Sequence, residues 1–116
     1  MKTLFILLAF LLLNACGKSG PSHPNNNQAL FSCQSVAKKK LKDPFSAEFD
    51  DYRNASVTEL KKLKIGSEYK ITYQVMGYVF AKNSFNATIK TTYGCVITGR
   101  TGKSYPSWTV DSVVVQ

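Results

Sequence analysis

The chain has 116 residues and a formal net charge of +8, from 15 lysine and arginine residues against 7 acidic ones. This length suits one small domain. The basic balance suits a negatively charged partner, although the same charge also serves solubility. Only one histidine, His23, is present, and this scarcity of groups that exchange protons near neutral pH argues against an enzyme.

The first sixteen residues have the pattern of a bacterial lipoprotein signal peptide. Lys2 supplies positive charge, and residues 4–13 form an apolar run of about ten residues, which is shorter than the roughly 20 that a spanning helix needs. The order Leu13-Asn14-Ala15-Cys16 resembles a lipobox, in which the cysteine is lipidated and becomes the new amino terminus. We therefore expect residues 1–15 to be a signal peptide and Cys16 to carry lipid. The alternative is a plain secretory signal or a small membrane anchor.

A lipid on Cys16 predicts a bacterial protein held on a membrane, with its domain facing the periplasm. Export argues against nucleic acid as a partner, which leaves the membrane itself, an anionic envelope polymer or an acidic protein. Gly17 after the anchor favours the outer membrane in an enterobacterial host. Because Cys16-Gly17-Lys18-Ser19 is similar to an inner-membrane retention signal of pseudomonads, both membranes stay open.

Residues 16–28 are expected to be the lipidated cysteine and a flexible tether, since the segment has no apolar periodicity. A domain then spans residues 29–116. Its first element is a helix over residues 29–42, preceded by asparagines that can serve as an N-cap and ended by Asp43-Pro44. The apolar stripe of this helix consists of Leu30, Cys33, Ala37 and Leu41.

Alternating apolar residues predict strands in the remainder of the chain. Residues 45–53 alternate with Phe45, Ala47 and Phe49 on one face. Residues 54–66 favour a strand that turns near Ile65-Gly66-Ser67, although Ser56 and Glu59 also fit the capping box of a short helix. Clearer strands follow at residues 68–80, 85–98 and 108–115.

The sulfur atoms of Cys33 and Cys95 are expected to meet in a disulfide. Cys33 lies on the apolar stripe of the helix, and Cys95 on the apolar face of the strand at residues 85–98. Once Cys16 carries lipid, these two remain as an even pair in an oxidising compartment. The fold class is therefore α+β, with one N-terminal helix packed on an antiparallel sheet of about four strands and one disulfide.

The sequence contains no motif of a catalytic or metal-binding site, so we expect no enzyme activity, no metal and no cofactor. Its single histidine lies in the expected tether, away from any serine or cysteine nucleophile of the domain. No pair of histidines, Cys-x-x-Cys motif or acidic loop indicates a metal ion. Asp50 and Asp51 are adjacent on an expected strand and therefore point to opposite faces.

Two segments are candidate binding sites. Lys38, Lys39 and Lys40 form a basic run that suits either an anionic surface or an ordinary solvated helix end. The second segment joins two expected strands and consists of Lys82, Asn83, Ser84 and Phe85. Its residues suit a hairpin turn. The alternative is a ligand or partner site with Asn83 and Ser84 as hydrogen-bonding groups and Phe85 as an apolar contact.

Several short motifs are similar to a small domain that recurs in uncharacterised bacterial and phage lipoproteins and secreted proteins. They are Leu41-Lys42-Asp43-Pro44-x-Ser46-Ala47-x-Phe49, Gly77-x-Val79-x-Ala81-Lys82-Asn83-Ser84-Phe85, Thr92-x-x-Cys95 and Trp108. The resemblance covers about residues 33–115 and departs at Asn86, where the family usually has glycine. It implies a domain of these boundaries and no particular activity.

Two functions are consistent with these features of the sequence. The first is a lipid-anchored envelope protein that acts as a non-enzymatic binding module. The alternative is an inhibitor or exclusion lipoprotein, which blocks a wall hydrolase or an incoming phage or plasmid.

Overall fold

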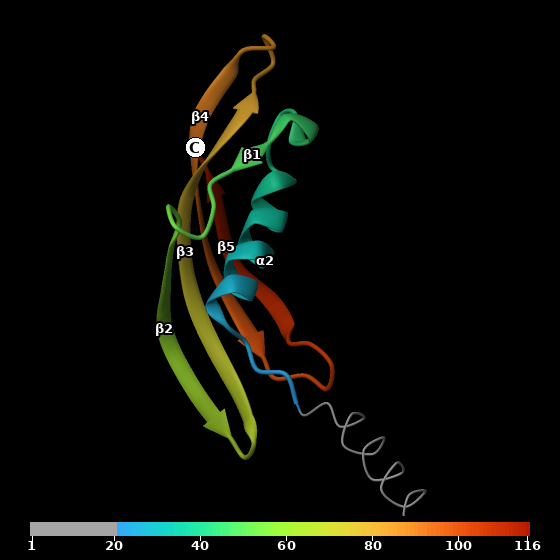
Figure 1. The fold of residues 1–116 in the computed structure, drawn as a ribbon, viewed down its shortest axis with the longest axis vertical. Coiled ribbons are helices and arrows are strands. Elements are labelled where there is room, and N and C mark those ends of the chain that lie inside the picture. The colour runs from blue at the N-terminus through green and yellow to red at the C-terminus, as the bar shows by residue number, and fades with distance from the viewer. Residues whose placement is uncertain (1–20) are drawn as a thin grey trace, which may run out of the picture.

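The computed structural model describes residues 21–116 and shows one helix packed on a five-stranded antiparallel sheet, which is an α+β fold (Figure 1). The predicted class is confirmed, with one strand more than the approximate four. The elements are α2 (Asn26–Lys38), a 3-10 turn η1 (Pro44–Ser46), β1 (Glu48–Phe49), β2 (Ser56–Ile65), β3 (Glu68–Lys82), β4 (Thr88–Arg100) and β5 (Ser107–Val115).

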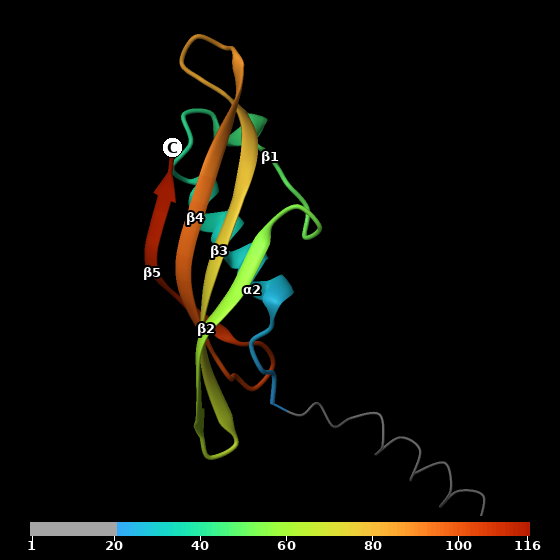
Figure 2. The same ribbon diagram turned by 90° about the vertical axis from the view of Figure 1, so that its left-hand side faces the viewer.

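Strand β3 is the centre of the sheet, because it pairs with β4 along one edge and with both β2 and β1 along the other. Strand β5 pairs only with β4. The β2–β3 and β3–β4 hairpins turn at opposite ends of this long, curved sheet, as Figures 1 and 2 show. Strand β1 pairs with β3 near the β3–β4 hairpin, with Glu48 opposite Phe80.

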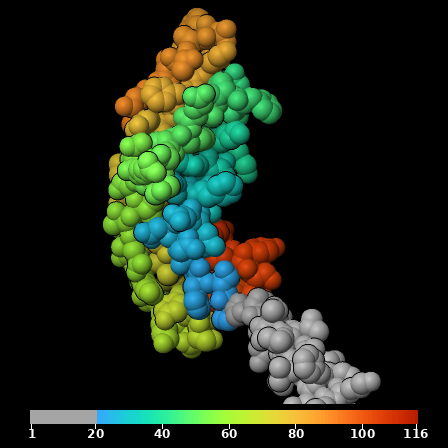
Figure 3. Space-filling model, in the orientation of Figure 1, coloured from blue at the N-terminus to red at the C-terminus, as the bar shows by residue number. Residues whose placement is uncertain are grey.

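The core lies between α2 and one face of the sheet. Strand alternation places Tyr73 and Val75 of β3 beside Cys95 and Ile97 of β4 on this face, and all four are buried as predicted. The helix contributes Leu30, Cys33 and Ala37 of the predicted stripe, and Ala29, which lies outside that stripe, is buried as well. Figure 3 shows that the helix covers only the middle of the molecule, so both hairpins extend past it.

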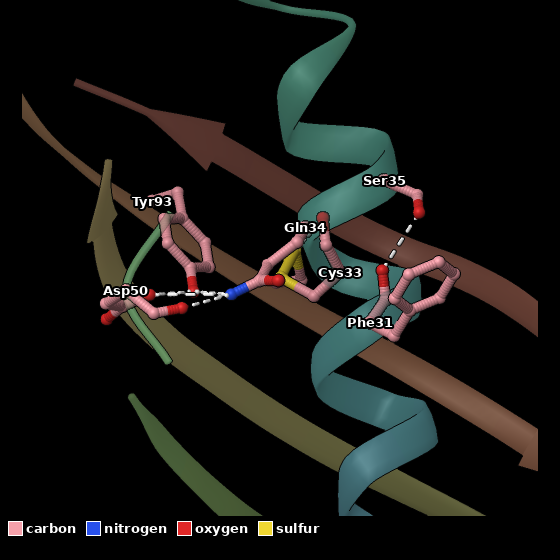
Figure 4. The surroundings of a disulfide bond; sticks show 7 residues. Phe31, Cys33, Gln34, Ser35, Asp50 and Tyr93 are labelled. Atoms are coloured by element: carbon pink, nitrogen blue, oxygen red, sulfur yellow. Dashed lines mark hydrogen bonds between the residues drawn. A yellow bond between two sulfur atoms is a disulfide. The ribbon is translucent and has the colours of Figure 1, made fainter. Parts of the chain in front are cut away.

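Cys33 of α2 and Cys95 of β4 form the predicted disulfide, with their Cα atoms 5.8 Å apart. The bond closes a loop with a sequence separation of 62 residues. It therefore fastens the helix to the centre of the sheet (Figure 4).

The helix is shifted toward the N-terminus relative to the expected residues 29–42. Asn25 is its N-cap, and the side-chain oxygen accepts a hydrogen bond of 2.9 Å from the Gln28 amide. At the other end, the amides of Lys40 and Leu41 bond to carbonyls three residues earlier, which tightens the last turn and ends the helix at Lys38. Leu41 still packs against the core, but from outside the helix.

The expected strand over residues 45–53 is wrong except for Glu48–Phe49. Pro44 starts a 3-10 turn instead, because its ring fixes φ and removes a backbone donor. The turn carries Phe45 outward, where it is 97% exposed, whereas Ala47 and Phe49 pack against the core. Ser46 Oγ accepts a hydrogen bond of 2.8 Å from the Lys82 amide, so the turn is fastened to the end of β3.

The β2–β3 hairpin forms as predicted, whereas the predicted start of the strand after the β3–β4 hairpin is wrong. Residues 56–65 form the favoured strand, and the turn follows at Gly66, whose φ of 64° suits the first position of a two-residue loop. Strand β4, in contrast, begins at Thr88, so Phe85 lies in the loop and is 88% exposed. Asn86 takes a φ of 63° there, a left-handed conformation that asparagine tolerates.

The chain contacts the domain from Ser22 onward, within the segment expected to be a tether. Ser22 and Gly102 exchange two backbone hydrogen bonds of 2.8 and 3.0 Å. His23 Nδ1 lies 2.8 Å from Thr101 Oγ1. These contacts define the N-terminal end of the domain, which also holds the turn of the β2–β3 hairpin at Gly66.

No helix within residues 21–116 is both long enough and apolar enough to cross a membrane. The expected signal peptide and the lipidation site Cys16 lie outside the described residues.

Candidate functional site

The two predicted binding segments lie together at one end of the molecule, opposite Ser22. The segment after α2 and the β3–β4 hairpin border a shallow pocket of about 130 Å³. Its lining residues are Lys40, Leu41, Lys42, Ala81, Lys82, Asn83, Ile89, Thr91 and Val115. We call this region the pocket end.

The pocket exists because the sheet continues past the last turn of the helix. Ala81, Ile89 and Thr91 lie on the sheet face that α2 covers further down, so they form an apolar floor. The chain that leaves the helix forms a wall that carries Lys40 and Lys42. The floor supplies apolar contact, and the wall supplies positive charge.

The lysines of the pocket end are exposed, Lys38 and Lys39 included. Among residues 21–116, the one ion pair joins Arg100 to Glu68 at the other end of the molecule. Within this part of the chain, the positive charge of Lys40, Lys42 and Lys82 is therefore free to attract an anionic group.

In the loop of the β3–β4 hairpin, one predicted site residue stabilises the turn and two others are exposed to solvent. The side-chain oxygen of Asn83 accepts hydrogen bonds from the amides of Phe85 at 2.9 Å and Ala87 at 3.1 Å. Asn83 therefore holds the turn through its side chain. Ser84 and Phe85 are exposed and remain available to a partner.

A free strand edge lies beside the pocket. Thr92 and Gln116 exchange two backbone hydrogen bonds, both 2.9 Å. In an antiparallel strand, every second residue directs its N–H and C=O to the same edge. The backbone groups of Thr88 and Lys90 therefore point to the same edge of β4 as those of Thr92, which is the edge along which β5 lies. Within residues 21–116, no strand pairs with this edge beyond Thr92.

A buried polar cluster, which sequence reasoning missed, lies beside the disulfide (Figure 4). Tyr93 Oη donates a hydrogen bond of 2.7 Å to Asp50 Oδ1, and Gln34 Nε2 donates to Tyr93 Oη at 3.1 Å and to the Asp50 carbonyl at 2.9 Å. Asp50 Oδ2 accepts from the Tyr78 amide at 3.1 Å. Burial and the hydrogen bond to Asp50 raise the pKa of Tyr93 far above its ordinary value.

This cluster ties three parts of the fold together. Gln34 comes from α2, Tyr93 from β4, and Asp50 from the chain just after β1. Room for the Asp50 carboxylate exists because Gly77 has no side chain, since a Cβ there would meet Asp50 and Tyr93. The apolar alternation of residues 45–53 did not predict this cluster, because Asp50 lies just after the end of β1 and not within a longer strand.

The sheet face away from the helix carries a second hollow, of about 350 Å³. Gly94 forms part of its floor, between the half-exposed side chains of Met76 and Val114. Sequence reasoning concentrated on the buried face of each strand and therefore overlooked it.

Within residues 21–116, no group of three histidine, cysteine, aspartate or glutamate side chains is placed to hold a metal ion. Comparisons of the chain with protein-family models, with curated proteins and with solved structures found no match.

Proposed function

We propose that this protein is a lipid-anchored bacterial envelope protein that acts as a non-enzymatic binding module. Its pocket end binds an acidic segment of another envelope protein, which adds to the free edge of β4 as an extended strand. The observation that carries this proposal is the meeting of Lys40, Lys42 and Lys82 around one pocket beside an unpaired strand edge.

The chemistry of the pocket end supports a peptide more than a polymer of sugars. The backbone groups of Thr88 and Lys90 suit main-chain hydrogen bonds with a peptide, as in strand addition. The apolar floor at Ala81 and Ile89 suits alternate side chains of such a strand. The lysines around the pocket favour acidic residues in the same segment.

The path of the chain supports an anchor at the far end. Residues 21–24 pack beside the β4–β5 loop (Figure 1), and the pocket lies at the other end of the sheet. A lipid on Cys16 would hold the N-terminal end near the membrane and leave the pocket end open to the periplasm.

The polar interior supports binding rather than catalysis. Asp50, Tyr93 and Gln34 satisfy one another inside the fold and beside the disulfide. The polar side chains that line the pocket are those of three lysines, Asn83 and Thr91. Such groups attract and orient an anionic partner.

The test uses the full-length lipidated protein in vesicles of phosphatidylcholine and a fluorescent peptide that alternates glutamate with valine. We expect anisotropy to show binding that weakens as salt increases. The substitutions Lys40→Gln, Lys42→Gln and Lys82→Gln together should weaken it by about tenfold or more. The matched control changes Lys61, Lys62 and Lys64 to glutamine and should bind like the parent.

Two results would contradict the proposal. Binding of the peptide that is equal in both triple variants would remove the pocket end from the interaction. Cosedimentation with isolated peptidoglycan, without binding of the peptide, would show that the partner is a wall polymer instead.

A further inference from the structure

The N-terminal end of the domain carries a second basic surface, which no local pattern in the sequence indicates. It comprises the far part of the β2–β3 hairpin and the neighbouring ends of β3 and β4, and its basic residues are Lys61, Lys62, Lys64, Lys70, Arg100 and Lys103. Glu59 and Glu68 are the acidic residues among them, and Glu68 is paired with Arg100 at 3.6 Å. Positive charge therefore prevails at this end. We call it the hairpin surface.

The hairpin projects beyond the rest of the sheet. Strand β4 accompanies β3 only as far as Arg100, which lies opposite Lys70. From Lys64 to Glu68, the hairpin strands pair only with each other. Tyr69 is also bonded to the chain after β4, because its carbonyl accepts a hydrogen bond of 3.0 Å from the Thr101 amide. Figures 1 and 2 show this two-stranded tip reaching past the β4–β5 loop.

One face of the tip carries lysines over an aromatic ring, and the other mixes apolar with charged side chains, since Leu63 lies opposite Lys70 and Ile65 opposite Glu68. Lys62 and Lys64 lie over the ring of Tyr69, with their ammonium groups 4.7 and 5.9 Å from its centroid. Strand alternation places Leu63 and Ile65 on the other face, where they are 42% and 53% exposed. Such a ribbon combines apolar side chains with lysines whose long stems let the charged heads reach toward phosphates.

The position of the expected anchor adds a second argument. Cys16 and Ser22 are separated by residues 17–21, which span at most about 20 Å when extended. Ser22 is paired with Gly102 beside the hairpin surface. A lipid on Cys16 would therefore hold this surface, rather than the pocket end, within reach of the headgroups.

We infer that the hairpin surface docks on anionic lipid headgroups, an inference that rests on the lipid anchor of the proposed function. Leu63 and Ile65 enter the headgroup boundary, and Lys61, Lys62 and Lys64 attract phosphates. Docking holds the long domain upright, so that the pocket end points away from the membrane. The lipid supplies a high local concentration, so weak contacts suffice.

Two matched probe sites test this orientation. Ser67 lies in the turn of the β2–β3 hairpin, and Ser84 lies in the loop of the β3–β4 hairpin at the opposite end. Each becomes the attachment site of a fluorophore through Ser67→Cys or Ser84→Cys in the full-length lipidated protein. The protein is placed in vesicles whose headgroups carry a spin-label quencher.

In vesicles of phosphatidylethanolamine and phosphatidylglycerol, we expect quenching at residue 67 and little at residue 84. In phosphatidylcholine, the quenching at residue 67 should fall. Glutamine at Lys61, Lys62 and Lys64 should lower the ratio of docked to undocked protein by about fivefold for each lysine. Glutamine at Lys38, Lys39 and Lys40 is the control and should leave the quenching unchanged.

The outcomes separate docking from anchoring. If the protein floats with anionic vesicles and both probes are quenched equally, the docking is wrong although the anchor stands. If quenching at residue 67 is the same in phosphatidylcholine, anionic lipid is not the partner. If the protein does not float with vesicles at all, both the anchor and the docking are contradicted.

Discussion

His23 Nδ1 and Thr101 Oγ1 lie 2.8 Å apart, and the His23 ring meets Tyr69 edge-on with a centroid separation of 4.9 Å. Tyr69 belongs to β3, and Thr101 follows β4. These contacts therefore fix where the chain joins the domain. The lipid anchor proposed at Cys16 would therefore pull on this end of the sheet, while the basic pocket occupies the other end.

The first prediction concerns the anchor. Replacing Cys16 with serine should release the protein from the membrane pellet or leave it unprocessed, because serine cannot carry the thioether-linked lipid. The measurement is membrane fractionation with intact mass of the parent and of Cys16→Ser. A serine variant that is processed and pelleted like the parent would contradict lipidation at this residue.

The second prediction concerns the disulfide. The double variant Cys33→Ala with Cys95→Ala should unfold in urea with a free energy lower by about 4 kcal/mol, the chain-entropy value for a loop of about 60 residues. Equilibrium unfolding of the oxidised parent and of the variant measures the difference. Reductant should lower the free energy of unfolding of the parent to a similar extent and leave that of the variant unchanged. If reductant also destabilises the variant, the loss in the parent does not come from this disulfide.

The third prediction concerns pH. The pKa of Tyr93 is raised above its ordinary value of 10.0 by burial and by the hydrogen bond to Asp50. The unfolded chain therefore loses this proton at a lower pH than the folded chain does. Stability from Tyr93 is complete below pH 10 and is lost as the pH rises above it.

The variant Tyr93→Phe should cost about 1–2 kcal/mol at neutral pH, because Asp50 loses its short hydrogen bond. It should also lose less stability than the parent between neutral pH and strongly alkaline pH. Urea unfolding across this range gives both numbers. Parallel pH profiles of parent and variant would show that Tyr93 does not carry this dependence.

The fourth prediction compares two glycines of neighbouring strands. A Cβ at Gly77 would overlap the Asp50 carboxylate and come within 2.6 Å of Tyr93 Oη, whereas a Cβ at Gly94 has its nearest neighbour at 3.7 Å. Gly77→Ala should therefore destabilise the fold by about 2 kcal/mol or more. Gly94→Ala should be neutral or slightly stabilising. Equal thermal denaturation of the two variants would argue against the buried cluster as a constraint.

The sequence predicted the core well, because burial follows the periodicity of apolar residues. The alternation in β3 identified Tyr73 and Val75, and the helical stripe placed Cys33 opposite Cys95. The predicted strand at residues 45–53 was wrong, because Pro44 starts a 3-10 turn, although Ala47 and Phe49 of the apolar alternation do pack against the core. The prediction also failed at Phe85, because the loop of the hairpin takes up residues 83–87.

The candidate site was only partly predictable. The sequence supplied Lys40 and Lys82 as separate candidates, and the long β3 strand brings them to one pocket. Nothing local in the sequence links residues 42 positions apart. The hairpin surface was missed for a similar reason, since Leu63 and Ile65 alternate with lysines as in any half-buried strand, and only the length of β4 shows that the tip lies outside the sheet.

The central claim is that the two basic ends have different partners. Hydrogen–deuterium exchange of the lipidated full-length protein tests it directly, on anionic vesicles and with the glutamate–valine peptide. Vesicles should slow exchange in residues 61–70 and not in residues 83–91. The peptide should slow exchange at Thr88 and Lys90 and not in the β2–β3 hairpin. Protection of residues 83–91 by vesicles, or of residues 61–70 by the peptide, would contradict the account.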